Sequence, residues 1–259
     1  MTAERSDTAA QFSRQAEAYA ASATHAKDAD LDIVEALADC RPGDCCLDIA
    51  TGPGNAAFRL ARKAGLVVAC DIAPGMLRVA RRQAGERGLS NLRVVLAAAE
   101  ALPFPAAAFD AITCRIAPHH FRSVPAFLGE AARCLKPSGR FVLEDSLAPE
   151  EPATAAFLEE IETLRDASHA HTLSHAEWMA AMAGAGLTVT AEQVFRKVHD
   201  FAPWIERTGL ERAAIDAIVA RILIAPPEVT RGLFDLEGGQ VTRLNDRKLI
   251  LRAGIRSRF

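Results

Sequence analysis

Residues 45–71 constrain the fold more than any other part of the chain. An apolar run with an acid next to its end, Cys46-Leu47-Asp48-Ile49, leads into the turn sequence Ala50-Thr51-Gly52-Pro53-Gly54-Asn55. A second apolar run, residues 66–70, ends at Asp71. Glycines in such a turn let the backbone approach a ligand, where a side chain would clash. The pattern predicts a buried strand, a turn, a helix and a second strand ending in a carboxylate, and such a unit binds a nucleoside.

The same alternation continues to residue 145. Strand-like runs at 45–49, 66–70, 92–97, 109–115 and 140–145 alternate with helical patterns at 56–62, 75–86 and 124–135. This rhythm is typical of a parallel, doubly wound α/β sheet, whose ligand crevice lies at the carboxyl ends of the strands. The helical pattern of residues 11–37 precedes the first strand, so we expect it to cap the sheet.

The rhythm changes after Asp145. Helical patterns at 152–167 and 175–183 predict a helical insertion that covers the crevice. The chain then continues with a strand-like run at 187–198, helical patterns at 201–207 and 211–224, a helix beginning at Pro226-Pro227 and a closing strand at 240–254. We therefore expect N-terminal cap helices at 1–43, a nucleoside-binding core at 44–147, and lid helices with closing strands of the same sheet at 148–259.

Composition excludes several classes of protein. Half of the 259 residues are apolar, which is enough for a large core, and the six cysteines form neither a Cys-x-x-Cys pair nor a zinc spacing. They are typical of reduced core residues in a cytoplasmic protein. The polar N-terminus lacks a signal peptide pattern, and no apolar run is long enough to span a membrane. A net charge of −3 argues against nucleic acid as a partner. Oligomeric state is not predicted.

The nucleoside could belong to either of two cofactor types. Gly52-x-Gly54-x-x-Ala57 also satisfies the dinucleotide fingerprint, with Asp71 as the expected acid. Asp48 separates the two interpretations, because a carboxylate immediately before the turn would repel a pyrophosphate and attract a cation. The sequence therefore favours a positively charged ligand.

At this point the chain resembles the class I S-adenosylmethionine (SAM) dependent methyltransferases. Three later stretches match their pattern in order: Glu100-Ala101-Leu102-Pro103-Phe104, Phe109 to Arg115, and Leu135 to Leu143. The core is similar to the small-molecule, quinone-biosynthesis branch of the family (methyltransferase type 11). The resemblance implies a Rossmann-like, mostly parallel seven-stranded sheet, with SAM as cofactor and S-adenosyl-L-homocysteine as product.

The resemblance also implies roles for particular residues. Asp48 would accept from the methionine ammonium, directly or through water, and Asp71 would hold both ribose hydroxyls, while Ile72 and Met76 would enclose the adenine. The cofactor-binding candidates are Tyr19, Asp48, Ala50, Gly52, Gly54, Asp71, Ile72, Met76, Ala99, Glu100 and Arg115.

Two positions depart from the family pattern. Ala50 replaces the usual first glycine, a change the backbone tolerates if φ is negative there. Ala98 replaces the usual aspartate that binds the adenine amino group, so recognition would fall to the backbone N–H of Ala99, to Glu100 or to water. Losing that contact should weaken cofactor binding by about 1–2 kcal/mol.

Histidines mark the substrate side. His119 and His120 follow the fourth strand, where the resemblance places the transferred methyl group, and are the candidate catalytic residues. A base is needed only if the nucleophile arrives protonated, and a histidine suits that role. His25, His169 and Trp204 are candidate substrate contacts. His169-x-His171 lacks further metal ligands, so no metal site is predicted.

The predicted function is SAM-dependent methyl transfer to a small, partly apolar metabolite by in-line displacement. Two alternatives stay open. The fold can use SAM for non-methyl-transfer chemistry such as decarboxylation, rearrangement or cyclisation, in which case S-adenosylhomocysteine would not accumulate. A non-catalytic SAM-binding subunit would bind the cofactor without a substrate pocket.

Overall fold

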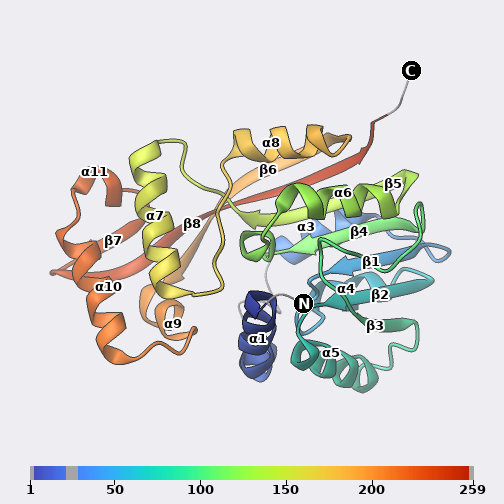
Figure 1. Ribbon diagram of the computed structural model, residues 1–259, viewed down its shortest axis with the longest axis horizontal. Helices are drawn as coiled ribbons and strands as arrows, with labels where there is room; N and C mark the ends of the chain where they lie inside the picture. Colours follow the sequence, from blue (N-terminus) through green and yellow to red (C-terminus); the bar gives the residue numbers. More distant parts are fainter. Residues whose placement is uncertain (1–2, 22–28, 257–259) are drawn as a thin grey trace. The chain divides into compact units, whose positions relative to one another are not determined.

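The computed structural model describes residues 3–21 and 29–256 (Figure 1). Its contacts divide the chain into two units. The first comprises Met1–Asp145, Met179–Gln193 and Ile250–Phe259, and the second comprises Ser146–Trp178 and Val194–Leu249. Among the described residues, none of the helices combines the length and apolar character required to cross a membrane.

The sheet follows the predicted plan. Its path is β3-β2-β1-β4-β5-β8-β6, and β7 pairs with β8 outside this path. The strands are β1 (Cys45–Ile49), β2 (Leu66–Asp71), β3 (Leu92–Leu96), β4 (Phe109–Arg115), β5 (Leu135–Ser146), β6 (Leu187–Asp200), β7 (Phe234–Glu237) and β8 (Gln240–Ile255). Strands β1 to β5 pair in parallel, which confirms the doubly wound core.

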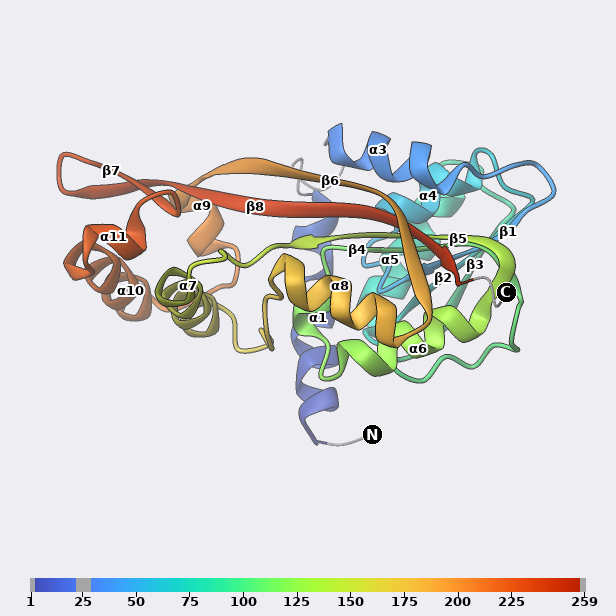
Figure 2. The same ribbon diagram turned by 90° about the horizontal axis from the view of Figure 1, so that it is seen from above.

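Helices follow the strands as expected. They are α1 (Ala3–Ala21), α3 (Ala29–Ala38), α4 (Asn55–Ala61), α5 (Pro74–Glu86), α6 (Val124–Cys134), α7 (Pro152–Arg165), α8 (His175–Gly184), α9 (Phe201–Glu206), α10 (Arg212–Ile224) and α11 (Pro227–Thr230), with a short 3₁₀ helix η1 (Pro118–His120). In the first unit, α3 and α4 lie on one face of the sheet and α6 lies on the other (Figure 2). Both faces of β1 and β4 are therefore buried, as their continuous apolar runs predict.

Helix α1 packs against the start of α5. A Cβ at Gly75 would lie 2.5 Å from the Cα of Ser13, so only glycine allows this approach. The N–H of Gly75 donates to Oγ of Ser13 at 3.1 Å. Phe12, Ala16 and Met76 join one apolar cluster at this contact. Helix α1 therefore packs on α5, and the expectation that residues 1–43 cap the sheet stays a prediction.

Two details of the sheet differ from the sequence-based prediction. The predicted seven strands become eight, because β7 forms an antiparallel hairpin with β8. Gly238 and Gly239 join them with φ values of 57° and 78°, the positive angles that a two-residue hairpin turn requires. Strand β5 also begins earlier than predicted: Leu135 pairs with Phe109, and the register shifts before Ala111 pairs with Arg140.

The second unit has its own apolar core. Aromatic and branched side chains from α7, α9, α10, β7 and β8 pack together there: Phe157, Ile161, Phe201, Trp204, Ile205, Ile218, Ile222, Phe234 and Leu244. The guanidinium of Arg165 lies 4.3 Å from the Trp204 ring centre, a cation–π contact at the edge of this core. Trp204 and its neighbours therefore stabilise the unit that contains them.

Candidate functional site

The turn after β1 takes the conformation that its glycines predict. Gly52 has φ of +55° and Gly54 has φ of +103°. A Cβ at Gly54 would lie 2.5 Å from the Phe58 ring, whereas a Cβ at Gly52 would meet no atom within 4 Å. Ala50 has φ of +53°, so the condition of a negative φ is not met. Ala50 thus takes a left-handed conformation that costs an ordinary residue about 1–2 kcal/mol.

Asp48 lies beneath this turn and holds it. Its side chain is buried, and both carboxylate oxygens accept short hydrogen bonds, from Oγ1 of Thr51 and from Oγ1 of Thr113, each at 2.6 Å. Burial raises the pKa of Asp48, and the two hydroxyls lower it in part. Asp48 therefore connects β1, the turn and β4 through its own side chain.

Asp71 ends β2 beside the same turn. One carboxylate oxygen accepts from the N–H of Gly52 at 2.9 Å, and the other accepts from the N–H of Ala73 at 2.8 Å. Burial raises the pKa of Asp71 to about 6, although the N–H groups of Ala73 and Gly52 lower it and nearby Asp48 raises it further. The turn and this carboxylate are thus brought together, as predicted from the spacing.

The predicted adenine side is built from the segment after β3. Ala98 and Ala101 form an isolated antiparallel bridge, and Ala99 between them is buried. Glu100 accepts from the N–H of Arg122 at 3.2 Å. Ile72 is half-buried, whereas Met76 is buried in the cluster with α1, which accounts for its burial without a ligand. Roles for these residues in binding adenine stay predictions.

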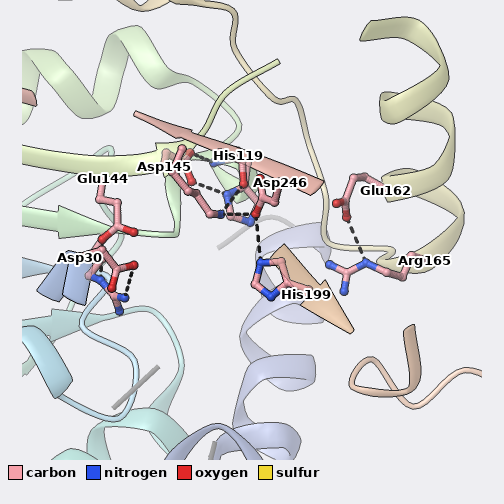
Figure 3. Close-up of polar contacts among 11 residues, drawn as sticks. Asp30, His119, Glu144, Asp145, Glu162, Arg165, His199 and Asp246 are labelled. Atoms are coloured by element: carbon pink, nitrogen blue, oxygen red, sulfur yellow. Dashed lines mark hydrogen bonds and ion pairs between the residues drawn. The ribbon is translucent and has the colours of Figure 1, made fainter. Parts of the chain in front are cut away.

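Arg115, at the end of β4, forms a buried ion pair network. Its Nε donates to Glu144 at 2.6 Å, and its Nη2 donates to Asp30 at 3.0 Å (Figure 3). The three side chains are at most 7% exposed. Burial lowers the pKa of Arg115 but the two carboxylates outweigh it, so the guanidinium stays charged. Arg115 thus ties the start of α3 to β4 and β5.

His119 lies next to a carboxylate that the sequence analysis did not identify. Its Nδ1 is 2.6 Å from Oδ1 of Asp145, and its backbone N–H donates to Oδ2 of Asp145 at 2.9 Å (Figure 3). The adjacent His120 ring lies 4.1 Å from the His119 ring and 5.0 Å from the Phe12 ring. The two histidines thus have different surroundings: a carboxylate lies at the His119 ring, and the Phe12 ring lies against that of His120.

Four candidates remain. His25 and the side chain of Tyr19 fall outside the described residues. His169 and Trp204 belong to the second unit, where Nε2 of His169 is 3.1 Å from Glu159 and Trp204 packs in the core. Their contact with a substrate stays a prediction.

Asp145 could have been found from the sequence, and Thr113 could not. Asp145 ends a predicted strand, Asp48 and Asp71 lie within one residue of the ends of two others, and the carboxyl ends of parallel strands meet at one edge of a sheet. Thr113 lies within β4, and its importance comes from its register opposite Asp48. No sequence pattern marks that pairing.

The residues at this edge fit SAM. The open space beside Gly52 admits a ligand, the Asp71 carboxylate suits a pair of hydroxyls, and Asp48 suits a cation. SAM has ribose hydroxyls that suit Asp71, and an ammonium and a sulfonium that suit Asp48. A dinucleotide would bring its pyrophosphate against Asp48.

Comparisons with known proteins identify the family and the fold. Residues 47–143 match the model of a methyltransferase domain family. The uncharacterized methyltransferase YcgJ of Bacillus subtilis is 37% identical over 76% of this chain and 78% of its own. Its crystal structure matches with a TM-score of 0.85, at 32% identity over 88% of this chain and 98% of that one.

Two further proteins extend the comparison. The structure of a putative methyltransferase (BH2331) from Bacillus halodurans matches with a TM-score of 0.86, at 29% identity over 89% of this chain and all of its own. The ubiquinone/menaquinone biosynthesis C-methyltransferase UbiE of Brucella anthropi is 34% identical over 67% of this chain and 66% of its own. The chain therefore belongs to the class I SAM-dependent methyltransferases, and SAM is its cofactor.

Proposed function

We propose that this enzyme transfers the methyl group of SAM to a small, partly apolar metabolite, with His119 as the base. The observation that carries the proposal is the pairing of His119 with Asp145 at the carboxyl edge of the sheet. In that sheet, Ile49 of β1 pairs with Cys114 of β4, and Arg115 pairs with Glu144 of β5. The turn after β1 and the His119 pair therefore follow neighbouring strands.

Each part of the edge has a separate task in this proposal. The turn at Gly52 and Gly54, with Asp48 and Asp71, holds the cofactor, which supplies an electrophilic methyl group when bound. His119 takes the proton that the acceptor loses. Alignment of the acceptor with the methyl group supplies most of the rate enhancement, since an in-line displacement needs the two reacting atoms held in one geometry.

The relatives support a small-molecule acceptor. UbiE is named as a C-methyltransferase of ubiquinone/menaquinone biosynthesis, which fits a partly apolar acceptor. The cytoplasmic location predicted from the sequence is part of the same proposal, and six free cysteines in the structure are consistent with it.

The test uses the purified full chain and SAM with a labelled methyl group. Calorimetry should show binding of SAM, and incubation with fractionated metabolites should transfer the label to a small molecule while S-adenosylhomocysteine accumulates. His119→Gln should lower the rate of transfer at least about 100-fold. His120→Gln should lower it less, because its ring packs on Phe12.

Two results would contradict the proposal. Binding of SAM without transfer of label to any fraction would favour the non-catalytic alternative. Conversion of a metabolite without accumulation of S-adenosylhomocysteine would favour non-methyl-transfer chemistry of the same fold.

A further inference from the structure

We propose that Asp145 is a positioning residue that fixes His119 in one tautomer, and that the methyl acceptor therefore carries a proton on its attacking atom, as a hydroxyl group or an acidic carbon–hydrogen bond does. The inference rests on the proposed methyl transfer and adds to it a residue and a substrate class. Both side chains lie in the first unit, Asp145 near the end of β5 and His119 in η1.

The carboxylate of Asp145 binds one residue twice. Oδ1 faces the ring Nδ1 of His119 at 2.6 Å, and Oδ2 accepts from the backbone N–H of His119 at 2.9 Å. The Asp145 side chain is 2% exposed and that of His119 is 13% exposed. Two bonds from a buried carboxylate to the ring and to the main chain of one residue restrict rotation of that ring.

The same contact selects the tautomer. An ionised carboxylate only accepts hydrogen bonds, so the ring nitrogen facing it is the one that carries hydrogen. In the neutral ring with hydrogen on Nδ1, the lone pair is on Nε2. Asp145 thereby makes Nε2 the basic nitrogen and stabilises the imidazolium that forms when Nε2 takes a proton.

The backbone before His119 is also fixed to β5. Ile116 has φ of +51°, an outlier for a β-branched residue, and its N–H donates to the carbonyl of Glu144 at 2.7 Å. Pro118 begins η1, and the N–H of His120 closes it on the carbonyl of Ala117 at 2.9 Å. Strained backbone persists only where its surroundings hold it, so the segment keeps His119 against Asp145.

His119 is needed as a base only if the attacking atom of the acceptor carries a proton when the acceptor binds. The proton of the acceptor passes to Nε2 of His119, and the acceptor oxygen or carbon forms the bond to the methyl group. The electron pair of the broken carbon–sulfur bond stays on sulfur, which leaves a neutral thioether, and the proton on His119 is later released to solvent. A thioether or tertiary amine carries no proton to remove and would not use the pair.

The positioning role can be tested without the acceptor. In cofactor-free protein labelled with ¹⁵N, long-range ¹H–¹⁵N spectra at about pH 8.5, where histidine is neutral, report which ring nitrogen carries hydrogen. His119→Gln assigns the signals. We expect hydrogen on Nδ1 in the wild type, and a shift toward the Nε2–H form in Asp145→Asn. Asp39→Asn, at an exposed carboxylate, serves as the matched control and should leave the tautomer unchanged.

Kinetics test its consequence once the labelling screen yields a product. Asp145→Asn should lower kcat at least about 100-fold with the Kd for SAM unchanged, and Asp145→Glu should restore part of the rate. The methylated atom should be one that carries a proton in the acceptor, such as a hydroxyl oxygen or an acidic carbon. An unchanged tautomer and kcat in Asp145→Asn, or a product methylated on a thioether sulfur or a tertiary amine nitrogen, would overturn the inference while methyl transfer itself stands.

A failure of the proposed function would look different. If no acceptor takes the label, the methyl-transfer proposal falls, and the tautomer spectra still decide whether Asp145 positions His119. Binding of SAM checks that each variant is folded. A rate that is lost because the variant is unfolded is therefore not taken as support for the positioning role of Asp145.

Discussion

At the scale of single residues, Ala50 carries a strain that the usual glycine would not. Its φ of +53° belongs to the left-handed region, where a Cβ meets the following carbonyl oxygen. Ala50→Gly should therefore raise the free energy of unfolding, by up to about 1 kcal/mol after the greater chain entropy of glycine is subtracted. Urea denaturation measures the change.

The control for this prediction is an alanine in an ordinary conformation. Ala126 is exposed in α6, and Ala126→Gly should lower the free energy of unfolding by about 1 kcal/mol. If both substitutions destabilise the protein equally, Ala50 carries no strain.

Asp71 gives the cofactor site a pH dependence. Its pKa of about 6 lies above the unfolded value of about 3.9. The neutral carboxyl therefore contributes stability that is present below pH 3.9 and lost as the pH rises through 6. Binding of ribose hydroxyls favours the carboxylate, so the affinity for S-adenosylhomocysteine should fall as the pH drops below 6, by up to about tenfold per unit. Calorimetry at several pH values checks this.

Asp71→Asn is the matched variant for that experiment. It should bind S-adenosylhomocysteine more weakly at neutral pH, because an amide is uncharged and has one acceptor oxygen where the carboxylate has two, and its affinity should lose most of the dependence near pH 6. A wild-type affinity that is flat between pH 5 and pH 7 would show that Asp71 does not contact the cofactor.

At the scale of secondary-structure elements, the Arg115 network joins three of them. Arg115 reaches Asp30 at the start of α3 and Glu144 in β5 from its place at the end of β4. Arg115→Met leaves two buried carboxylates without their cation, and should cost about 3 kcal/mol in the free energy of unfolding. Arg82→Ala, which removes an exposed pair with Glu17, should cause no measurable change. Equal effects in denaturant titrations would contradict a buried network.

A cysteine in the connection between α3 and β1 lies beside a cysteine of β1. Sγ of Cys40 lies 3.1 Å from Sγ of Cys46, and both side chains are buried. The hydrogen bond with Cys46 lowers the pKa of Cys40, and the Arg140 guanidinium lowers it further. Hydrogen peroxide should oxidise the two thiols to a disulfide with release of two water molecules. Mass spectrometry should show the loss of two hydrogen atoms and a peptide joining both cysteines.

Single substitutions separate this pair from the other thiols. Cys46→Ser should abolish the mass change, and Cys114→Ser should leave it intact because Cys114 lies in β4 and is not part of the sulfur pair. Peroxide treatment that yields only sulfinic or sulfonic acids would show that the sulfurs do not approach in solution.

Elements whose signal lies within a short stretch were predictable from the sequence. The runs at β1, β2 and β4 have apolar residues bounded by turn residues, and their positions are confirmed. The sequence analysis missed strand β7, although Gly238-Gly239 is a hairpin signal. The strand before this turn has only four residues, too few for a clear strand pattern. The partners of Arg115 and Asp48 depend on tertiary register, which pairs residues far apart in the sequence.

At the scale of the whole molecule, the cofactor should stabilise the chain by mass action. A ligand that binds only the folded state adds about 2.7 kcal/mol at 100 times its Kd. S-adenosylhomocysteine at that concentration should therefore raise the melting temperature by roughly 5 °C in calorimetric scans. Asp71→Asn at the same ligand concentration should show a smaller rise. An unchanged melting temperature in the wild type would contradict binding to the folded protein.

Ile116 bears on attempts to make this enzyme more robust. Replacing a positive-φ isoleucine by glycine or asparagine is a standard way to gain stability, and at this position it would succeed as a stabilisation. The same change would loosen the segment that leads to His119, so the gain would be accompanied by slower turnover. Selection for heat tolerance alone would therefore enrich substitutions at residue 116. The selected variants would be more stable and would have a lower kcat.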